Sequence, residues 1–190
     1  MKIQISEEPI AALAEQARLS AAFRVDRIFE LSQQADRFVL SERNLDVPYL
    51  KDYDAIENPI HWATRFDVSS WGYIAARSMG RRVGGAVIAW NSPGLDMLED
   101  RADLAVLWDI RVAPEHRGRN IGSSLFAAAE AWAVSKNCRQ LKVETQNINV
   151  NACRFYAKHG CVLKTVRRLA YPMLPDEIQM LWYKDLSAAE

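Results

Sequence analysis

Hydrophobic and polar positions in the second half of the chain follow a regular order of strand and helix patterns. Residues 103–114 (DLAVLWDIRVAP) and 139–147 (RQLKVETQN) each have the short apolar alternation of a strand. Pro114 ends the first of them, because proline lacks the N–H that a sheet ladder needs. The segment between them predicts a helix with one apolar face, since its apolar residues recur at helical spacing: Ile121, Leu125, Ala128 and Trp132.

The rest of this half continues the alternation. Residues 149–160 predict a second helix, with Asn149 or Asn151 near its N-cap and Gly160 as its stop. Two strand-like runs, 161–171 and 177–186, close the pattern. A strand, helix, strand, helix, strand order implies a crossover between neighbouring parallel strands. The pattern therefore predicts a mixed α/β fold.

The first half has weaker patterns. Residues 21–32 and 37–45 alternate as strands, and residues 70–90 read as a hairpin that turns near Gly80. Residues 91–103 are rich in turn formers and predict a loop, while residues 9–21 predict either a short opening helix or a loosely ordered stretch. Because no repeat, low-complexity tract or linker interrupts the chain, we expect one domain over residues 1–190.

Composition excludes several classes of protein. Lys plus Arg and Asp plus Glu each total 24, so no bulk positive charge favours nucleic acid or an anionic membrane. No apolar run reaches the length of a membrane span or resembles a secretory signal. Three cysteines without close pairing are typical of a reduced, cytoplasmic chain. Together with His159 they lack the paired spacing of metal ligands, so we expect no metal site: Cys138, Cys153 and Cys161.

The stretch RVAPEHRGRNIGSS, residues 111–124, places arginines and glycines directly before the first predicted helix. A helix N-terminus exposes N–H groups and carries partial positive charge, and glycine lets a phosphate approach the backbone. On spacing alone, the pattern fits a diphosphate site and a tight turn bearing solvated arginines equally well. The glycine spacing matches neither a P-loop nor a three-glycine dinucleotide fingerprint.

Two landmarks in this half resemble the GNAT superfamily of N-acetyltransferases. Arg117 and Gly122 in VAPEHRGRNIGSSLF match the ends of its Arg/Gln-x-x-Gly-x-Gly/Ala signature, whereas Asn120 departs from the central glycine. The run NVNACRFYAKHGC resembles its second landmark at Asn149, Ala152, Phe155, Tyr156 and Gly160, with Cys161 in place of the usual Phe. The resemblance covers roughly residues 70–186. It implies a central mixed sheet flanked by helices, with a splayed parallel strand pair forming the acyl-CoA cleft.

The same resemblance implies acetyl-CoA as the acetyl-donor cosubstrate. Its diphosphate is expected on the loop and first turn of the helix: Arg117, Gly118, Arg119, Asn120, Ile121, Gly122 and Ser123. Its pantetheine arm is expected along the backbone of Ile110, Arg111 and Val112. Asn149 and Asn151 are further candidate contacts, although Asn149 is equally suited to capping its helix.

The resemblance also implies the catalytic roles. The acceptor ammonium must lose a proton before it attacks, and a carboxylate directly or through water can take it. Glu144 and Asp109 are the candidate bases, and Tyr156 matches the position of the acid that protonates the departing thiolate. Direct attack is favoured, since no cysteine occupies a recognisable nucleophile position. The alternatives are a Tyr156 in the core and a Glu144 on a solvated strand face.

Within the superfamily, LKVETQNINVNACRFYAKHG and the upstream DVPYLKDYD are most similar to streptothricin acetyltransferases. This likeness implies a small cationic amine as the acceptor, with the β-lysine amine of a streptothricin-type antibiotic favoured, and we expect residues 1–68 to shape the acceptor side. Acidic and aromatic residues of the first half are candidate acceptor contacts, with a solvated acidic loop or a core position as the alternative: Tyr49, Asp52, Tyr53, Asp54 and Trp71. Other functions left open are a peptide, protein or polyamine N-acetyltransferase and a non-catalytic acyl-CoA-binding module. A homodimer is plausible, because residues 177–186 have apolar side chains on both faces.

Overall fold

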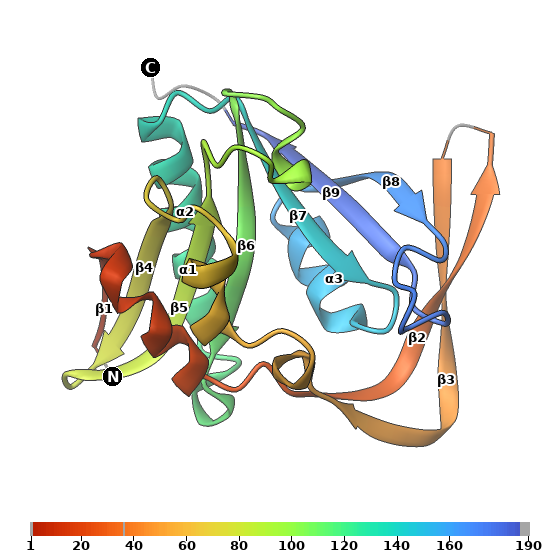
Figure 1. Ribbon diagram of the computed structural model, residues 1–190. Helices are drawn as coiled ribbons and strands as arrows, with labels where there is room; N and C mark the ends of the chain where they lie inside the picture. The colour runs from red at the N-terminus through yellow and green to blue at the C-terminus, as the bar shows by residue number, and fades with distance from the viewer. Residues whose placement is uncertain (1, 36, 187–190) are drawn as a thin grey trace. The chain divides into compact units, whose positions relative to one another are not determined.

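The computed structural model describes residues 2–35 and 37–186, and these fall into two compact units (Figure 1). Among these residues, the first unit comprises 2–21, 52–142 and 185–186, and the second comprises 22–35, 37–51 and 143–184. Strand β7 (Gln140–Gln146) begins in the first unit and ends in the second.

An antiparallel sheet forms the centre of the first unit. Its strands are ordered β1 (Ile3–Glu8), β4 (Gly72–Ser78), β5 (Arg81–Ala89) and β6 (Leu104–Val112), followed by the start of β7. β4 and β5 form the predicted hairpin, and its two loop residues, Met79 and Gly80, have φ angles of 50° and 76°. Two consecutive left-handed residues are typical of the tight turns that match the twist of a hairpin. The sequence prediction is confirmed here.

The predicted crossover joins β6 to β7 through helix α2 (Ile121–Ser135). The carbonyl of Asp103, just before β6, accepts hydrogen bonds from the N–H groups of Arg139 (2.8 Å) and Gln140 (3.3 Å) at the start of β7. The two strands therefore begin side by side and run in the same direction. This parallel pair within a mostly antiparallel sheet confirms the mixed α/β fold.

Neighbouring glycines on β5 show that the two faces of the first unit's sheet are covered by different elements. A Cβ on Gly84 would meet Leu125 and Ile121 of α2, whereas a Cβ on Gly85 would meet Gln16 of the 3-10 helix η1 (Ile10–Arg18). Successive strand residues point to opposite faces, so α2 and η1 pack on opposite sides (Figure 1). The η1 side holds a buried apolar cluster: Leu13, Trp62, Trp71, Tyr73, Val87, Ala89, Leu95, Leu98 and Val106.

Short helical turns connect the remaining segments of this unit. They are η2 (Tyr53–Ala55), η3 (Pro59–His61), α1 (Trp62–Arg65), η4 (Asp96–Leu98) and η5 (Pro114–His116). The prediction of a short opening helix at residues 9–21 is confirmed by η1. The turn-rich segment 91–103 is a loop that contains only η4.

The second unit contains a long hairpin and three further strands. The hairpin consists of β2 (Phe23–Gln34) and β3 (Arg37–Lys51), and the strands are ordered β7, β9 (Gln179–Asp185) and β8 (Val162–Arg167). Helix α3 (Val150–Lys158) buries Val150, Cys153 and Tyr156, three residues on one face. The helix begins at Asn149 and is followed by Gly160 at φ 82°, as the sequence predicts.

A buried asparagine ties the hairpin to the strands of this unit. The backbone carbonyl of Asn147 accepts from Phe29 N–H (2.9 Å), and its side-chain amide donates to Phe29 O (3.1 Å). On the other side, Asn147 Oδ1 accepts from the N–H of Ile178 (2.8 Å). One residue therefore satisfies backbone groups of β2 and of the segment before β9, as buried polar backbone requires.

Two strands differ from the sequence prediction. β1 was not predicted, and β3 continues beyond residue 45 to Lys51, through Pro48. Pairing of Tyr49 with Val25 and of Lys51 with Phe23 holds this extension. Proline is tolerated in a strand that lies at a sheet edge, where its missing N–H breaks no ladder bond, so a two-stranded ribbon accepts it.

The contact between β4 and α2 yields a stability prediction. A Cβ on Gly72 would lie 2.5 Å from Cε2 of Trp132, whose indole N–H donates to Glu7 (2.9 Å). We expect Gly72→Ala to lower the free energy of unfolding by about 1–3 kcal/mol, because the ring must move out of a packed position. Urea unfolding measures this. In a Trp132→Leu background the same substitution should cost much less, and an equal cost in both backgrounds would contradict the assigned clash.

Candidate functional site

The loop before α2 has the backbone of an anion site. Gly118 has φ 75° and Asn120 has φ 63° and ψ 7°, with Arg119 between them outside the left-handed region. Alternation of this kind turns successive N–H groups toward one side, as in anion-binding nests. Asn120 is the N-cap of α2 but makes no side-chain cap bond. Its role in the turn is therefore conformational, as expected of the residue that best tolerates the left-handed region after glycine.

The first turn of α2 adds further donors to this loop. The first intrahelical bond runs from Ser124 N–H to Asn120 O (3.1 Å). The N–H groups of Ile121, Gly122 and Ser123 precede it and have no acceptor within the helix. These groups and the positive end of the helix dipole favour a negatively charged group at this point.

Arg117 has its side chain folded back onto the protein. Its Nε donates to Val112 O (3.0 Å) and its Nη2 donates to Ser20 O (3.3 Å). Arg117 therefore fastens the loop to the end of β6 and to the segment after η1. Arg119 is exposed on the same loop.

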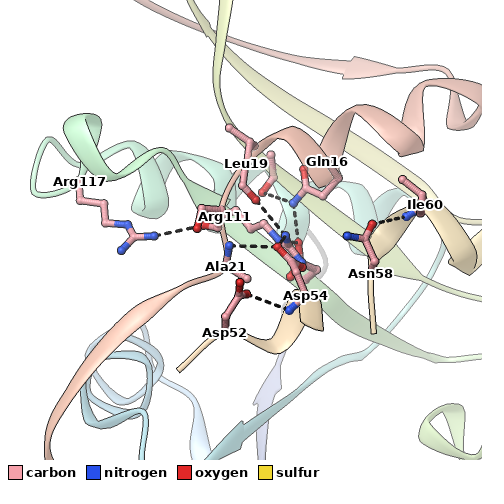
Figure 2. Close-up of polar contacts among 12 residues, drawn as sticks. Gln16, Leu19, Ala21, Asp52, Asp54, Asn58, Ile60, Arg111 and Arg117 are labelled. Atoms are coloured by element: carbon pink, nitrogen blue, oxygen red, sulfur yellow. Dashed lines mark hydrogen bonds and ion pairs between the residues drawn. The ribbon is translucent and has the colours of Figure 1, made fainter. Parts of the chain in front are cut away.

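A buried ion network centres on Arg111, the next-to-last residue of β6 (Figure 2). Its side chain is buried, and its Nε donates to Asp109 Oδ2 (2.7 Å). Its Nη1 donates to Asp54 Oδ2 (2.8 Å) and to Leu19 O (2.9 Å). Gln16 Nε2 donates to the same Asp109 oxygen (2.6 Å). β6, η1 and the segment around η2 thus meet at one guanidinium.

Burial governs the ionisation of Asp109. It raises the pKa of this carboxyl, against the opposing effects of the Arg111 guanidinium and the Gln16 amide. For Arg111 burial acts to lower the pKa, but the Asp109 and Asp54 carboxylates reverse this, so its pKa is raised. Arg111 stays charged, and Asp109 serves as its hydrogen-bonded partner.

A β-bulge determines which side chains of β6 share a face. Val87 pairs with Asp109 and Ile88 pairs with Leu107, so Trp108 is the extra residue. The ring of Trp108 packs on Phe66 (centroids 5.2 Å apart) and Trp71 (5.3 Å), on the side of the sheet that carries η1. Bulges recur beside active sites because they redirect side chains. Here the bulge places a half-buried tryptophan directly before Asp109.

Glu144 lies in a different environment, in the second unit. Its Oε1 accepts from Tyr171 O–H (2.6 Å) and Gln146 Nε2 (3.4 Å), and its Oε2 accepts from Gln179 Nε2 (2.7 Å). All three donors are uncharged. Burial and the adjacent Glu144 carboxylate raise the pKa of Tyr171, so its hydroxyl remains a donor at neutral pH. Sequence patterns did not predict Tyr171 and Gln179 as hydrogen-bond partners of Glu144. The third partner, Gln146, could have been inferred, because it lies two residues from Glu144 on the same strand face.

Tyr156 and the asparagines near it lie on α3. Tyr156 is buried, with its ring against that of Phe155 (centroids 5.3 Å apart). Asn149 Oδ1 accepts from Ala152 N–H (3.1 Å), the N-cap bond that its sequence position indicated, and Asn151 is exposed. Ile110 and Val112 flank Arg111 on β6, where the pantetheine arm is expected.

The candidate acceptor residues of the first half have structural partners. Asp54 binds Arg111, Asp52 caps η2 through Asp54 N–H (3.0 Å), and Trp71 is buried against Phe66. Tyr53 begins η2 in the first unit. Tyr49 lies on β3 in the second unit, where partial burial and the neighbouring Glu177 and Asp176 raise its pKa.

Two other features are absent from the described residues, a metal-ligand cluster and a membrane-spanning helix. Across residues 2–35 and 37–186, His, Cys, Asp and Glu form no group of three suited to a metal ion. Within the same ranges, no helix has the length and apolar character needed to cross a membrane. All three cysteines are buried and unbridged.

Comparisons with known proteins agree with this geometry. The model of the acetyltransferase (GNAT) family matches residues 26–161. A streptothricin acetyltransferase from Escherichia coli is 30% identical over 96% of this chain and 95% of its own length. The structure of a putative streptothricin acetyltransferase from Bacillus anthracis in complex with acetyl coenzyme A aligns with a TM-score of 0.78 and 25% identity, covering 98% of this chain and all of that one. A nourseothricin acetyltransferase structure has the same fold, with a TM-score of 0.76 and 20% identity over 98% of this chain and all of its own.

The Arg111 network yields a second prediction. Arg111→Met leaves the Asp109 and Asp54 carboxylates buried without their cation, so we expect a loss of about 3–5 kcal/mol in the free energy of unfolding at pH 7. Urea unfolding measures this. Arg43→Met, which breaks the exposed pair with Glu30 (2.6 Å), is the matched control and should cost less than about 1 kcal/mol.

The pH dependence of the unfolding free energy of Arg111→Met tests whether the loss comes from the buried carboxylate. Without Arg111 the folded state holds a proton on Asp109 at a pH where the unfolded chain has lost it. Stability then falls as pH rises above the unfolded pKa. The deficit of Arg111→Met relative to the unmodified protein should be larger at pH 8 than at pH 5. A deficit independent of pH would mean that the loss comes from packing alone.

Proposed function

Because the chain belongs to the acetyltransferase (GNAT) family, we propose that it transfers the acetyl group of acetyl-CoA to a primary amine of a streptothricin-type antibiotic. The chain is an acetyl-CoA-dependent acetyltransferase of GNAT type. The acceptor is the proposed part. It rests on one observation, the similarity to a streptothricin acetyltransferase along nearly the whole length of both chains.

The loop before α2 is the proposed seat of the CoA diphosphate. The left-handed residues Gly118 and Asn120 and the open N–H groups of the first helical turn supply donors that need no rearrangement to meet an anion. Arg117, held on Val112 and Ser20, contributes by fixing the loop. The backbone of Ile110, Arg111 and Val112 is proposed to pair with the pantetheine arm, as an added strand pairs with a sheet edge.

We assign the role of base to Glu144 and the role of acid to Tyr156. In the proposed reaction Glu144, directly or through water, takes a proton from the acceptor ammonium. The amine lone pair then attacks the thioester carbonyl carbon, a C–N bond forms, and the C–S bond breaks. The thiolate of CoA takes its proton from the Tyr156 hydroxyl, and the nitrogen, positively charged after the attack, loses its second proton through water to the Tyr156 phenolate, which restores the phenol; the proton on Glu144 passes to solvent.

The hydrogen-bond partners favour Glu144 over Asp109 as the base. Asp109 accepts from a buried guanidinium, and protonating its carboxylate would weaken that ion pair. The donors on Glu144 are a phenol and two amides, so its negative charge is not neutralised by them. A carboxylate in this state retains its attraction for an ammonium group.

Aromatic side chains of the first unit support a cationic acceptor. Trp108 and Phe66 are only partly buried and pack edge to face beside Asp109. Aromatic ring faces attract ammonium and guanidinium groups. We propose these two rings as acceptor contacts in place of Trp71, which is buried against both of them.

A thiol-release assay with acetyl-CoA tests the function. We expect acceptor-dependent release with streptothricin at a kcat/KM at least about tenfold above that for a polyamine or a peptide with a free N-terminus. Loss of antibiotic activity in the same mixture identifies the modified molecule. Turnover with the peptide alone would replace the proposed acceptor, and no turnover with any amine would overturn the activity.

The catalytic roles are tested with matched variants. Glu144→Gln should lower kcat at least about 100-fold, and Tyr156→Phe about 10–100-fold, since each removes one proton transfer. Glu30→Gln and Tyr183→Phe are the controls in the same unit and should retain near-normal kcat. Unchanged acceptor-dependent turnover in either test variant would reject the role assigned to that residue.

Asn120 provides a separate test of the diphosphate seat. Asn120→Gly keeps the left-handed turn and removes a side chain that crowds a phosphate, so calorimetry should give an acetyl-CoA affinity equal to or tighter than that of the unmodified protein. Asn120→Ala also shortens the side chain, but alanine is strained at this φ. This substitution should lower the free energy of unfolding by about 1 kcal/mol. A large loss of affinity in Asn120→Gly would make the amide side chain itself a ligand.

A further inference from the structure

A pocket of about 280 Å³ in the first unit is lined mainly by arginine and plays no part in the reaction described above. Its walls come from the end of η1 and from the β4–β5 hairpin. The lining residues are Glu15, Arg18, Leu19, Arg77, Arg81 and Arg82. Four guanidinium groups around one small cavity are a feature of oxyanion sites.

Arg82 is the residue that points to a ligand. Its side chain is only 9% exposed, and Nη2 donates to Glu8 Oε2 (2.5 Å). Its Nε and Nη1 are fully buried and have no hydrogen-bond acceptor in the described part of the chain. The guanidinium lies over the ring of Tyr73, 5.1 Å from its centroid, which supports its face and leaves the donors at its edge unsatisfied. Buried unsatisfied donors are costly, so an acceptor at this point is favoured.

The acidic residues nearby leave the pocket with excess positive charge. Glu8 is shared between Arg82 and Arg77 (2.8 Å), and Glu15 pairs with Arg18 (3.0 Å). Although burial opposes it, hydrogen bonds from Arg77 and Arg82 lower the pKa of Glu8, which stays ionised at neutral pH. Two carboxylates therefore face four arginines.

We propose that this pocket binds a phosphate-type dianion, with Arg82 donating through Nε and Nη1 and Arg81 adding charge at the rim. The pocket lies at the same end of the sheet as the loop before α2. Val83 follows Arg82 directly, and its carbonyl accepts from Ala113 N–H (2.9 Å), just before that loop. Two molecules could supply this phosphate group: free inorganic phosphate, or CoA through its 3′-phosphate.

Calorimetric titration with inorganic phosphate, without acceptor and at an ionic strength held constant with chloride, tests the free anion. If free phosphate is the occupant, Arg82→Gln should raise its Kd at least about tenfold, as expected for loss of charge-assisted hydrogen bonds. Arg81 is exposed, so we expect Arg81→Gln to fold normally and to raise the Kd about threefold. Arg43→Gln, in the second unit, is the control and should leave the Kd unchanged.

Titration with CoA and with dephospho-CoA tests the other source. If the 3′-phosphate occupies the pocket, the unmodified protein prefers CoA, and Arg82→Gln and Arg81→Gln reduce that preference while Arg43→Gln keeps it. If free phosphate is the occupant, the preference is the same in all four proteins. The proposal is overturned if phosphate binds no better than chloride and the CoA preference is also unaffected by both pocket variants. Because neither titration uses an acceptor, this result is independent of the proposed antibiotic substrate.

Discussion

The arrangement of the first unit depends on one interaction, the ion network of the buried Arg111 guanidinium. Its donors reach Asp109 on its own strand, Asp54 beside η2, and the carbonyl of Leu19 at the end of η1. Removing a charge from water is expensive unless every donor finds a partner. The planar fork of arginine places three of its five N–H groups on acceptors from three segments, a geometry that the ammonium of lysine cannot match. The network therefore fixes η1 and the segment around η2 against β6. The strand proposed to receive the pantetheine arm is the one that carries this arginine.

The need to pair the buried Arg111 guanidinium also distinguishes the two candidate bases that the sequence predicted, Asp109 and Glu144. Asp109 and Glu144 both lie on neighbouring strands of the predicted parallel pair, and residue type alone does not distinguish them. The structure gives Asp109 a guanidinium and an amide, and it gives Glu144 a phenol and two amides. A carboxylate that balances a buried cation is part of the scaffold, whereas one held by neutral donors keeps its charge available. The proposed division of roles rests on these partners rather than on position along the strands.

Local physics accounts for what the sequence predicted well. The β4–β5 hairpin, α2 and α3 follow from periodicity and from turn residues such as Gly80 and Gly160, whose left-handed φ angles are decided within a few residues. The contacts that define the site join residues far apart in the chain: Arg111 with Asp54, and Glu144 with Tyr171. The hydrophobic periodicity of a sequence carries no information about which distant residues form such a pair. Lys142 shows the same limit, because an alternating strand predicts a solvated lysine, yet its ammonium is buried on Met97 O (3.0 Å) and Glu99 (2.8 Å).

The arginines before α2 show why composition alone misleads about an anion site. Their number suggests that charge attracts the diphosphate, but the side chain of Arg117 is spent on the carbonyls of Val112 and Ser20. What remains for the proposed diphosphate is mainly backbone: the donors of the first helical turn, next to the left-handed residues Gly118 and Asn120. Oriented amides hold a phosphate without the rotamer entropy that a long side chain loses on binding. Asn120 therefore adopts the left-handed angle that glycine adopts most readily, so this turn keeps a side chain at a position that glycine could also occupy.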